Sequence, residues 1–270
     1  MTEEKAGVTE VRSGLLRALG VITLIADRAP ETLGVSTIAR ELDLPKAVAH
    51  RILKEFTAAS YLTFDDSTKQ YRLGPDALSL GMAALRSLDV PKVARPHLQQ
   101  LVTQTSETAT LSVRNGWVRV YIDQVLSPHE IRMAISLGTS NALHAGSSSK
   151  AILAHLSPAE IDQYLELPTL AAVTSSTITD ADELRHELEQ VRRLGYAVSL
   201  GERQAGAVSV AAPVYLASGE VFGSISLCGP RDRFNDELRE RYGLLVAETA
   251  AEISGELGHR ADDRQSRASS

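Results

Sequence analysis

Residues 35–56 hold two short amphipathic segments separated by so few residues that only two helices joined by a tight turn fit them. Ser36 is suited to cap the first helix through its side-chain oxygen. The apolar positions of that helix share one face: Ile38, Ala39 and Leu42. Pro45, with its fixed φ and missing N–H, suits the first turn of the second helix. This is the pattern of a helix-turn-helix, which predicts DNA as the ligand.

The second segment has an apolar face and an opposite face of small and basic side chains, which is typical of a DNA-reading helix. The residues expected to face the core are Val48, Ile52, Leu53 and Phe56. Those expected to face outward are Lys46, Ala47, Ala49, His50 and Lys54. Small and basic side chains on its first turns allow a helix to enter a major groove, where cations meet phosphates and base edges. On these two helices alone, an ordinary helical hairpin with solvated Lys and Arg remains an alternative.

The residues that follow predict a wing. Residues 61–64 and 70–73 have the pattern of two short strands around the polar turn 65–69, so residues 14–74 are expected to form a winged helix. Upstream, a supporting helix is expected to pack through the apolar stripe Leu15, Leu16, Leu19, Ile22 and either Leu24 or Ile25. Lys69 and Arg72 on the hairpin are expected either to contact phosphates or only to keep the hairpin solvated.

The local charge sets an expectation about how DNA is bound. The residues predicted to contact DNA are Ser36, Thr37, Lys46, Ala47, His50, Arg51, Lys54, Lys69 and Arg72. Arg51 could instead brace the domain by pairing with an acidic side chain. Between Pro45 and Arg72, five Lys or Arg stand against three Asp or Glu, which is a mild positive excess. So mild an excess predicts that two winged helices act together on paired half-sites of double-stranded operator DNA.

Composition fits a chain of two domains with ordinary cores, since 43% of its 270 residues are hydrophobic. No apolar run approaches the length of a membrane helix and residues 1–5 are polar, so a cytoplasmic protein without membrane contact is expected. Cys228 is the only cysteine and no Cys or His cluster has metal-ligand spacing, so no internal disulfide, metal or cofactor is expected. The net charge of −6 argues against a protein that coats nucleic acid non-specifically.

The rest of the chain mixes helical and strand patterns, which predicts an α+β fold with an antiparallel sheet flanked by helices. The expected helices are 74–88, 93–107, 147–156, 158–165, 180–193 and 234–253. The expected strands are 108–113, 118–125, 131–136, 196–200, 209–215 and 221–227. The expected parts are a DNA-binding domain at 1–74, a linker helix at 75–90, a second domain at 91–258 and a disordered tail at 259–270.

Helix ends in this second part carry clear signals. Ser157 and Glu160, with a proline between them, form a capping box that opens a short helix. Thr179 is expected to cap the helix that begins at residue 180, and Gly195 is expected to end that helix in the left-handed conformation.

Several segments of the second part carry a family resemblance. The segments are Gly195-Tyr-Ala-Val-Ser-Leu-Gly-Glu202, Gly206, Ser209-Val-Ala-Ala-Pro-Val-Tyr215, Gly219 and Ser224-Ile-Ser-Leu-Cys-Gly-Pro230, together with 137–138, 143–145 and 150–154. They closely resemble the signature of the IclR family of bacterial transcriptional regulators. The order of the parts matches as well, so that the resemblance covers residues 11–257.

The resemblance implies a GAF-like effector-binding domain with a small-molecule cavity. It also implies a homodimer formed through the DNA-binding part and linker helix, and a dimer of dimers formed through the effector domains. The expected function is a ligand-responsive transcription regulator, with repression as the expected mode and a small aromatic or short aliphatic carboxylate as effector. Carried over by motif position, the expected effector-binding residues are Leu143, Ala145, Gly146, Ser147, Ser199, Glu202, Ser209, Ser226 and Cys228.

This chain departs from the family pattern at some of these positions. Ser199 stands where many relatives have an acidic residue, and Ser209 stands where many have cysteine. Together with Ser226 and the backbone N–H groups of 146–148, these hydroxyls could bind a carboxylate; alternatively, the small residues only allow close packing of the sheet. Glu202 is either a ligand contact or a structural acceptor.

The DNA-reading helix also departs from the family pattern. Ala47 and Val48 lack the hydroxyls usual there, and His50 replaces an aromatic residue, so an altered set of phosphate contacts and a different operator are expected.

Two other classes of function are compatible with parts of the sequence: a serine hydrolase and a DNA-binding protein without a ligand. Ser147-Ser-Ser-Lys150 matches the Ser-x-x-Lys pattern of serine acyl hydrolases, in which the lysine helps to activate the serine, and His144 could be read as a general base. The companion motifs of that chemistry are missing, and adjacent serines make a chance match easy. The chain is therefore expected not to be an enzyme. The other alternative is a DNA-binding protein that needs no ligand.

Overall fold

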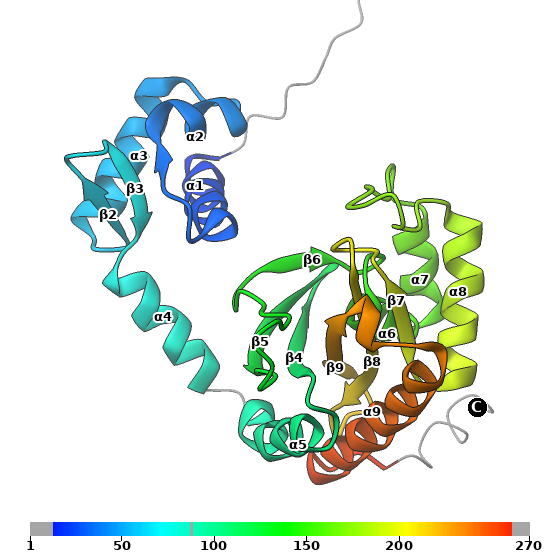
Figure 1. Cartoon of the computed structure of the whole chain (residues 1–270). Coiled ribbons are helices and arrows are strands. Elements are labelled where there is room, and N and C mark those ends of the chain that lie inside the picture. The colour runs from blue at the N-terminus through cyan, green and yellow to red at the C-terminus, as the bar shows by residue number, and fades with distance from the viewer. Residues whose placement is uncertain (1–12, 87–88, 261–270) are drawn as a thin grey trace, which may run out of the picture. The chain divides into compact units, whose positions relative to one another are not determined.

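The computed structural model describes residues 13–86 and 89–260, which form two compact units on either side of residues 87 and 88 (Figure 1). The predicted tail lies outside the described residues beyond Arg260. Its first residue, His259, stacks on the ring of Tyr215 with 4.8 Å between the ring centroids.

The first unit is a winged helix. Its helices are α1 (Gly14–Arg28), α2 (Val35–Glu41) and α3 (Lys46–Ala58), followed by α4 (Pro75–Arg86). Its strands are β1 (Leu33–Gly34), β2 (Leu62–Asp65) and β3 (Gln70–Leu73), in the antiparallel order β1-β3-β2. The side chains buried between helices and sheet are Val21, Ile25, Leu33, Ile38, Ile52, Leu53, Leu62 and Tyr71. The predicted hairpin and helix pair are therefore confirmed.

The turn of the wing is held by one carboxylate. Asp65 accepts hydrogen bonds from the backbone N–H of Ser67 at 2.8 Å, from the Ser67 hydroxyl at 2.6 Å and from the N–H of Thr68 at 3.3 Å. These bonds stabilise the ionised carboxylate and lower the pKa of Asp65 to about 2. The polar turn between the predicted strands thus has a specific structural cause.

Three details of the predicted winged helix are wrong. Ser36 does not cap α2, because the chain enters this helix directly from β1, with Gly34 at the cap position and no side-chain hydrogen bond there. Ala49 is fully buried, since it shares a helical face with Ile52 and Leu53, three and four residues further on. The first two turns of α1 leave three predicted core side chains exposed: Leu15, Leu16 and Leu19, with exposed fractions of 71%, 56% and 49%.

The second unit is built on a six-stranded antiparallel sheet in the order β6-β5-β4-β9-β8-β7. The strands are β4 (Thr108–Asn115), β5 (Val118–Val125), β6 (Ser140–Ala142), β7 (Ala197–Leu200), β8 (Ala207–Tyr215) and β9 (Val221–Pro230). The helices are α5 (Val90–Thr105), α6 (Ser147–Leu153), α7 (Pro158–Leu165), α8 (Ala181–Leu194), the short η1 (Arg231–Arg233) and α9 (Asp236–Glu256). The predicted α+β class is confirmed.

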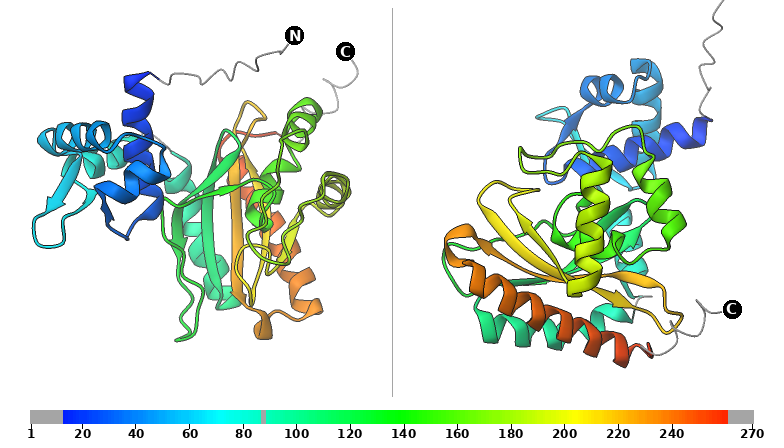
Figure 2. Two further views of the ribbon diagram at one scale, coloured as in Figure 1. Left: turned by 90° about the horizontal axis from the view of Figure 1, so that it is seen from above. Right: turned by 90° about the vertical axis from the view of Figure 1, so that its right-hand side faces the viewer.

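Helices cover both faces of this sheet, so the second unit has three layers (Figure 2). Helices α5 and α9 lie on one face, where Val208, Val210 and Leu227 join their core. Helices α6, α7 and α8 lie on the other, where Ala197 and Ala211 join a second core. Alternate residues of a strand point to opposite faces, so each central strand contributes to both sides of the sheet.

The predicted third strand of the antiparallel meander is wrong. Residues 131–136 have no strand structure, and the third strand is β6 instead. The backbone of Ile135 is held by the side chain of Gln124, which donates to its carbonyl at 2.6 Å and accepts from its N–H at 3.0 Å. A side-chain amide here takes the place of a neighbouring strand.

Two predicted helix-end signals of the second unit are confirmed, and three predicted helix starts are wrong, including that of α5, which begins at Val90 rather than at residue 93. The capping box of Ser157 and Glu160 is present, and Gly195 ends α8 with φ of +79°. The cap of α8 is Asp180 rather than Thr179, because the Asp180 carboxylate accepts the N–H groups of residues 182 and 183. Phe234 precedes the closing helix α9 and is buried in the core instead of opening the helix.

No helix in residues 13–86 or 89–260 is long and apolar enough to cross a bilayer.

The packing of α9 against β7 yields a test of this fold. A methyl group at Gly243 would lie 2.3 Å from the ring of buried Tyr196, whereas one at Gly255, in the same helix, would meet nothing within 4 Å. Gly243→Ala is expected to lower the free energy of unfolding by about 1–3 kcal/mol. Gly255→Ala is expected to raise it by up to about 1 kcal/mol, because alanine favours the helix. Chemical denaturation of both variants measures this, and equal effects would contradict the packing described.

Candidate functional site

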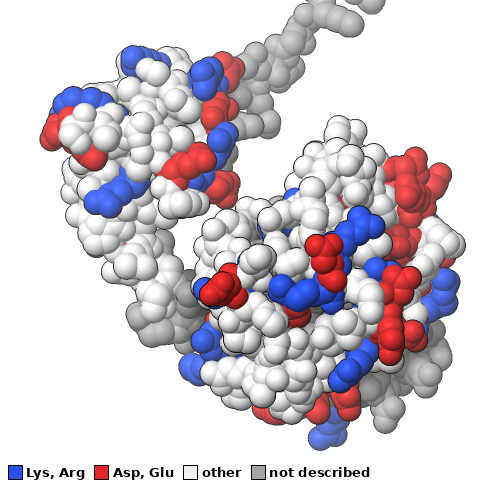
Figure 3. All heavy atoms as spheres, viewed as in Figure 1, with Lys and Arg blue, Asp and Glu red and all other residues white. Residues whose placement is uncertain are grey.

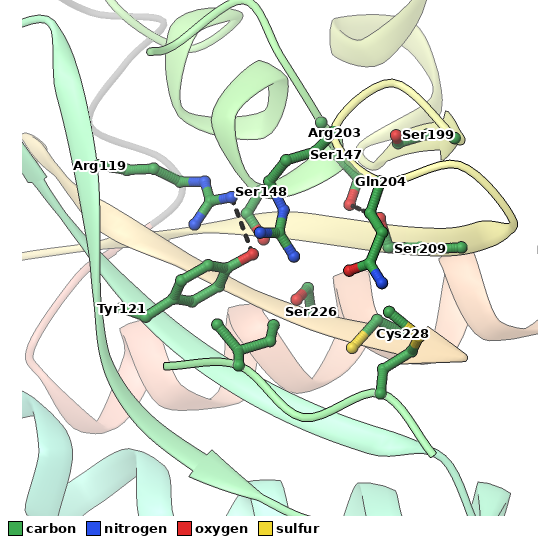
Figure 4. A pocket seen from close by; sticks show the side chains of 15 residues that line it. Arg119, Tyr121, Ser147, Ser148, Ser199, Arg203, Gln204, Ser209, Ser226 and Cys228 are labelled. Carbon is green, nitrogen blue, oxygen red and sulfur yellow. Dashed lines mark hydrogen bonds between the residues drawn. The ribbon is translucent and has the colours of Figure 1, made fainter. Parts of the chain in front are cut away.

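The second unit contains a cavity between the sheet face that carries α6 and the start of that helix (Figure 4). The centre of a water molecule can occupy about 30 Å³ of it. Six of the sequence-predicted residues line it: Gly146, Ser147, Ser199, Ser209, Ser226 and Cys228. Ser148, whose backbone N–H was expected to face a ligand, lines it too, as do residues that were not predicted, chiefly Arg119, Tyr121, Arg203 and Gln204.

Strand alternation explains why these side chains converge. Arg119 and Tyr121 are two residues apart on β5, and Ser226 and Cys228 are two apart on β9, so each pair shares one face of the sheet. The residues between them point to the opposite face, where Leu227 is buried in the core with α5 and α9. The cavity is therefore a polar patch on a face that is otherwise packed.

The serine hydroxyls of the cavity are partly engaged by the protein. Ser147 Oγ lies 2.7 Å from Ser209 Oγ, which joins the start of α6 to β8. Ser226 Oγ lies 2.7 Å from the hydroxyl of Thr110 on β4. Each hydroxyl can donate one hydrogen bond and accept two, so these groups retain capacity for a ligand.

Arg119 is the most unusual residue of the site. It is 1% exposed, and its Nε donates to Ser149 Oγ at 2.8 Å while its Nη2 donates to the Tyr121 hydroxyl at 2.8 Å. Its Nη1 is buried without a hydrogen-bond partner among the described residues. Burial lowers the pKa of this guanidinium from its ordinary value, because the charged form loses hydration. A buried donor left without a partner is costly and suggests a missing acceptor.

The cavity is electropositive. Arg203 is half-buried, and its guanidinium carbon lies 5.6 Å from the centroid of the Tyr121 ring, while that of Arg119 lies 4.0 Å from the same centroid. No Asp or Glu lines the cavity. Burial raises the pKa of the Cys228 thiol to about 12, so this side chain adds no negative charge at neutral pH. The site therefore favours an anion.

Glu202 does not line the cavity but holds its wall. Its carboxylate accepts from Lys150 Nζ at 2.6 Å and from the backbone N–H of Gly146 at 3.0 Å. Lys150 also donates to Glu187 at 2.6 Å. Of the two readings of Glu202, this geometry favours the structural acceptor. It also removes the Gly146 N–H from the set of donors expected for a ligand.

Leu143 and Ala145, which were also predicted to contact the effector, do not line the cavity. Leu143 is fully buried in the core with α6, α7 and α8. Ala145 is buried in the turn before α6.

The residues of the hydrolase alternative are engaged in other contacts. Lys150 donates to two carboxylates, and Ser147 bonds to Ser209. His144 Nδ1 lies 2.8 Å from the Tyr164 hydroxyl and its Nε2 lies 2.9 Å from the carbonyl of Ala171. Both ring nitrogens are thus used within the fold, which is the arrangement of a structural histidine rather than of a general base.

The predicted DNA-contact residues lie on the first unit, and all but one are exposed. The exposed ones are Ser36, Lys46, Ala47, His50, Arg51, Lys54, Lys69 and Arg72; Thr37 is half-buried. Arg51 forms no ion pair with any described residue, so its alternative role as a brace lacks support. Lys69 pairs with Asp66 at 3.1 Å, and Figure 3 shows positive and negative groups interspersed on the visible face of this unit.

Within the described part of the chain, no group of three or more His, Cys, Asp or Glu is arranged to hold a metal ion.

Two family models match this sequence: the IclR helix-turn-helix domain over residues 14–66, and the bacterial transcriptional regulator IclR C-terminal domain over residues 82–255. The HTH-type transcriptional regulator BhcR of Paracoccus denitrificans is 35% identical, over 91% of this chain and 88% of its own. The HTH-type transcriptional repressor AllR of Escherichia coli K12 is 32% identical, over 92% of this chain and 91% of its own.

Solved structures agree. A putative transcriptional regulator from Rhodococcus sp. RHA1 is 32% identical with a TM-score of 0.72, covering 90% of this chain and 97% of its own. An IclR homologue from Microbacterium hydrocarbonoxydans, crystallised with 4-hydroxybenzoate, is 25% identical with a TM-score of 0.72, covering 91% of this chain and 99% of its own.

The contacts of Lys150 generate a prediction about the stability of the cavity wall. Glu202→Gln is expected to lower the free energy of unfolding by about 3–5 kcal/mol, because it removes a partner from a buried ion pair. Glu187→Gln is the matched control: Glu187 is 25% exposed and Lys150 keeps Glu202, so about 1 kcal/mol or less is expected. Urea denaturation distinguishes the two, and a Glu187 effect as large as that of Glu202 would contradict this account.

Proposed function

Because the chain belongs to the IclR family of bacterial transcriptional regulators, we propose that it regulates transcription in response to a small carboxylate bound in the cavity of its second unit. DNA binding and transcription regulation follow from the family itself, which is non-enzymatic, so the acyl hydrolase alternative is set aside. The nature of the effector, the contact residues and the assembly are the proposed parts.

One observation carries the effector proposal. The cavity holds a buried arginine with an unpartnered nitrogen beside hydroxyl groups, and an anionic ligand with oxygen acceptors would satisfy it. A carboxylate can accept two parallel hydrogen bonds from one guanidinium. The complex of the Microbacterium homologue with 4-hydroxybenzoate supports a carboxylate, since that ligand contains one.

The DNA-binding role is assigned to residues 1–74, with 75–90 as the linker helix and 91–258 as the effector domain. The proposed DNA contacts are the exposed residues of α3, led by Lys46, His50 and Arg51, with Lys69 and Arg72 of the wing. Lys46 and the Lys69 hairpin would meet phosphates, whereas His50 would meet base edges.

A homodimer, and a dimer of dimers, is proposed as the working assembly. Apolar side chains stand exposed on both α1 and α4: Leu15, Leu16, Leu19, Leu78, Leu80 and Met82. Apolar surface of this extent on two helices is typical of a subunit interface. One winged helix with so mild a positive charge would bind DNA weakly. Two-fold pairing would provide a second set of phosphate contacts.

The proposed mechanism is a shift of populations. An effector that binds one arrangement of the paired effector domains more tightly than the other favours that arrangement by its difference in binding free energy. The linker helices would then change the spacing of the paired winged helices and thus the affinity for the operator. Repression is the proposed mode, supported by the repressor AllR among the relatives.

A first prediction concerns DNA. Lys46→Ala is expected to weaken binding to DNA from the promoters of its own and neighbouring genes by about tenfold, and to reduce the slope of log affinity against log salt by about one. Fluorescence anisotropy across a salt series measures both. Lys92→Ala, which removes an exposed lysine from α5 of the second unit, is the control and should leave affinity unchanged. A Lys46 variant that keeps wild-type affinity and salt slope would exclude this contact.

A second prediction concerns the effector. In a thermal-shift panel of small aromatic and aliphatic carboxylates, at least one acid should raise the melting temperature and change the affinity for promoter DNA, whereas its neutral amide should do neither. The amide keeps the size and shape of the acid but lacks the charge that Arg119 recognises. The effector proposal fails if no acid has either effect.

A further inference from the structure

The cavity holds more positive charge than one carboxylate can balance. The guanidinium groups of Arg119 and Arg203 lie next to each other over the Tyr121 ring (Figure 4). Neither of them forms an ion pair with a carboxylate within the described part of the chain. Two like charges in a confined space repel each other, and the ring face offsets only a small part of this repulsion.

The nearest carboxylates are committed to other cations. Glu202 is occupied by Lys150 and by the turn at Gly146. Glu107, near Cys228 at the far side of the cavity, binds Arg233 through both of its oxygens. The protein therefore supplies no counter-charge to either arginine of the cavity.

The two arginines differ in a way that suits two separate anionic groups. Arg119 is immobilised by Ser149 and Tyr121 and leaves Nη1 as a fixed donor. Arg203 is half-buried, lies in the loop between β7 and β8, and makes no side-chain hydrogen bond with a described residue. A ligand would thus find a fixed donor at the base of the cavity and an adjustable cation at its rim.

We infer that the effector of this chain is a dianion, a short dicarboxylate whose two carboxylates engage Arg119 and Arg203 separately. This inference rests on the proposed function and narrows its ligand class. One carboxylate accepts from Nη1 of Arg119, and the other pairs with the Arg203 guanidinium, while the hydroxyls of Ser209 and Ser226 can donate to the carboxylate oxygens.

The dimensions of the cavity limit the length of that ligand. Only about 30 Å³ of the cavity is open to the centre of a water molecule, so that it has room for very few water molecules. A chain of one or two carbons between two carboxylates suits so small a space, whereas a long-chain diacid does not fit it.

The test uses isothermal titration of the full-length protein with matched acids at constant ionic strength. The pairs are malonate with propionate and succinate with butyrate, in which the second acid replaces one carboxylate by a methyl group. At least one dianion is expected to bind tenfold or more tightly than its monoanion. Monoanions that bind as well as their dicarboxylates in both pairs, or the failure of every dicarboxylate to bind, would overturn the inference.

Two variants locate the charges. Arg203→Gln should reduce the preference for the dianion to less than about threefold while keeping monoanion affinity, because Arg119 remains. Arg119→Met should weaken the binding of both acids by tenfold or more. Arg193→Gln, which removes an exposed arginine of α8, is the control for general electrostatics and should leave both affinities unchanged. Arg203 makes no side-chain hydrogen bond to a described residue, so the Arg203→Gln variant is expected to fold. Its binding preference can therefore be measured even if the Arg119→Met variant does not fold. An unchanged preference in Arg203→Gln would overturn the assignment.

Failure of this inference and failure of the proposed function give different results. If an aromatic or aliphatic monocarboxylate stabilises the protein and alters DNA affinity while no dicarboxylate binds, the regulator responds to a carboxylate and only the dianion is wrong. If no acid of any kind binds or alters DNA affinity, both are wrong.

Discussion

The effector domain depends on the buried contact among Lys150, Glu202 and the turn at Gly146. This contact fixes the loop after β7 to the start of α6, and so sets the distance between the wall of the cavity and the sheet that forms its floor. An ion pair in such a place contributes more to one defined geometry than to net stability, because both charges lose hydration. It also consumes a carboxylate that would otherwise lie beside the arginines. The positive character of the cavity is therefore a result of how the wall is built.

Local signals in the sequence predicted the fold well where a single element decides its own structure. The capping box at Ser157, the end of α8 at Gly195 and the wing hairpin all depend on residues within a few positions of each other. The prediction of a strand at 131–136 was wrong because the structure of this segment depends on a residue outside it. Its backbone is satisfied by Gln124, a partner fixed only by the tertiary fold, and no periodicity can reveal that. The prediction that the leucines of α1 pack within the unit was wrong for a similar reason, since an apolar stripe on a helix does not identify the surface that covers it.

The candidate site could be predicted only in part. The family motifs led to the serines of β7, β8 and β9, which do line the cavity. They did not lead to Arg119 or Arg203, which lie outside the residues that those motifs mark. One signal for Arg119 was present: a charged residue in the strand pattern at 118–125, which is otherwise largely apolar, two positions before Tyr121. A strand arginine that shares a face with residues expected to be buried is a candidate ligand contact.

The unpartnered Nη1 of Arg119 bears on the stability of the protein in the absence of its effector. A charge buried without a counter-ion destabilises the unliganded domain, and a ligand that supplies the counter-ion adds its binding free energy to folding. At a hundred times its dissociation constant, a ligand contributes about 2.7 kcal/mol. In a cell, such a difference alters the fraction of molecules open to proteolysis. The abundance of the regulator would therefore rise with its effector, so that the guanidinium proposed to bind the effector would also set how much of the regulator is present.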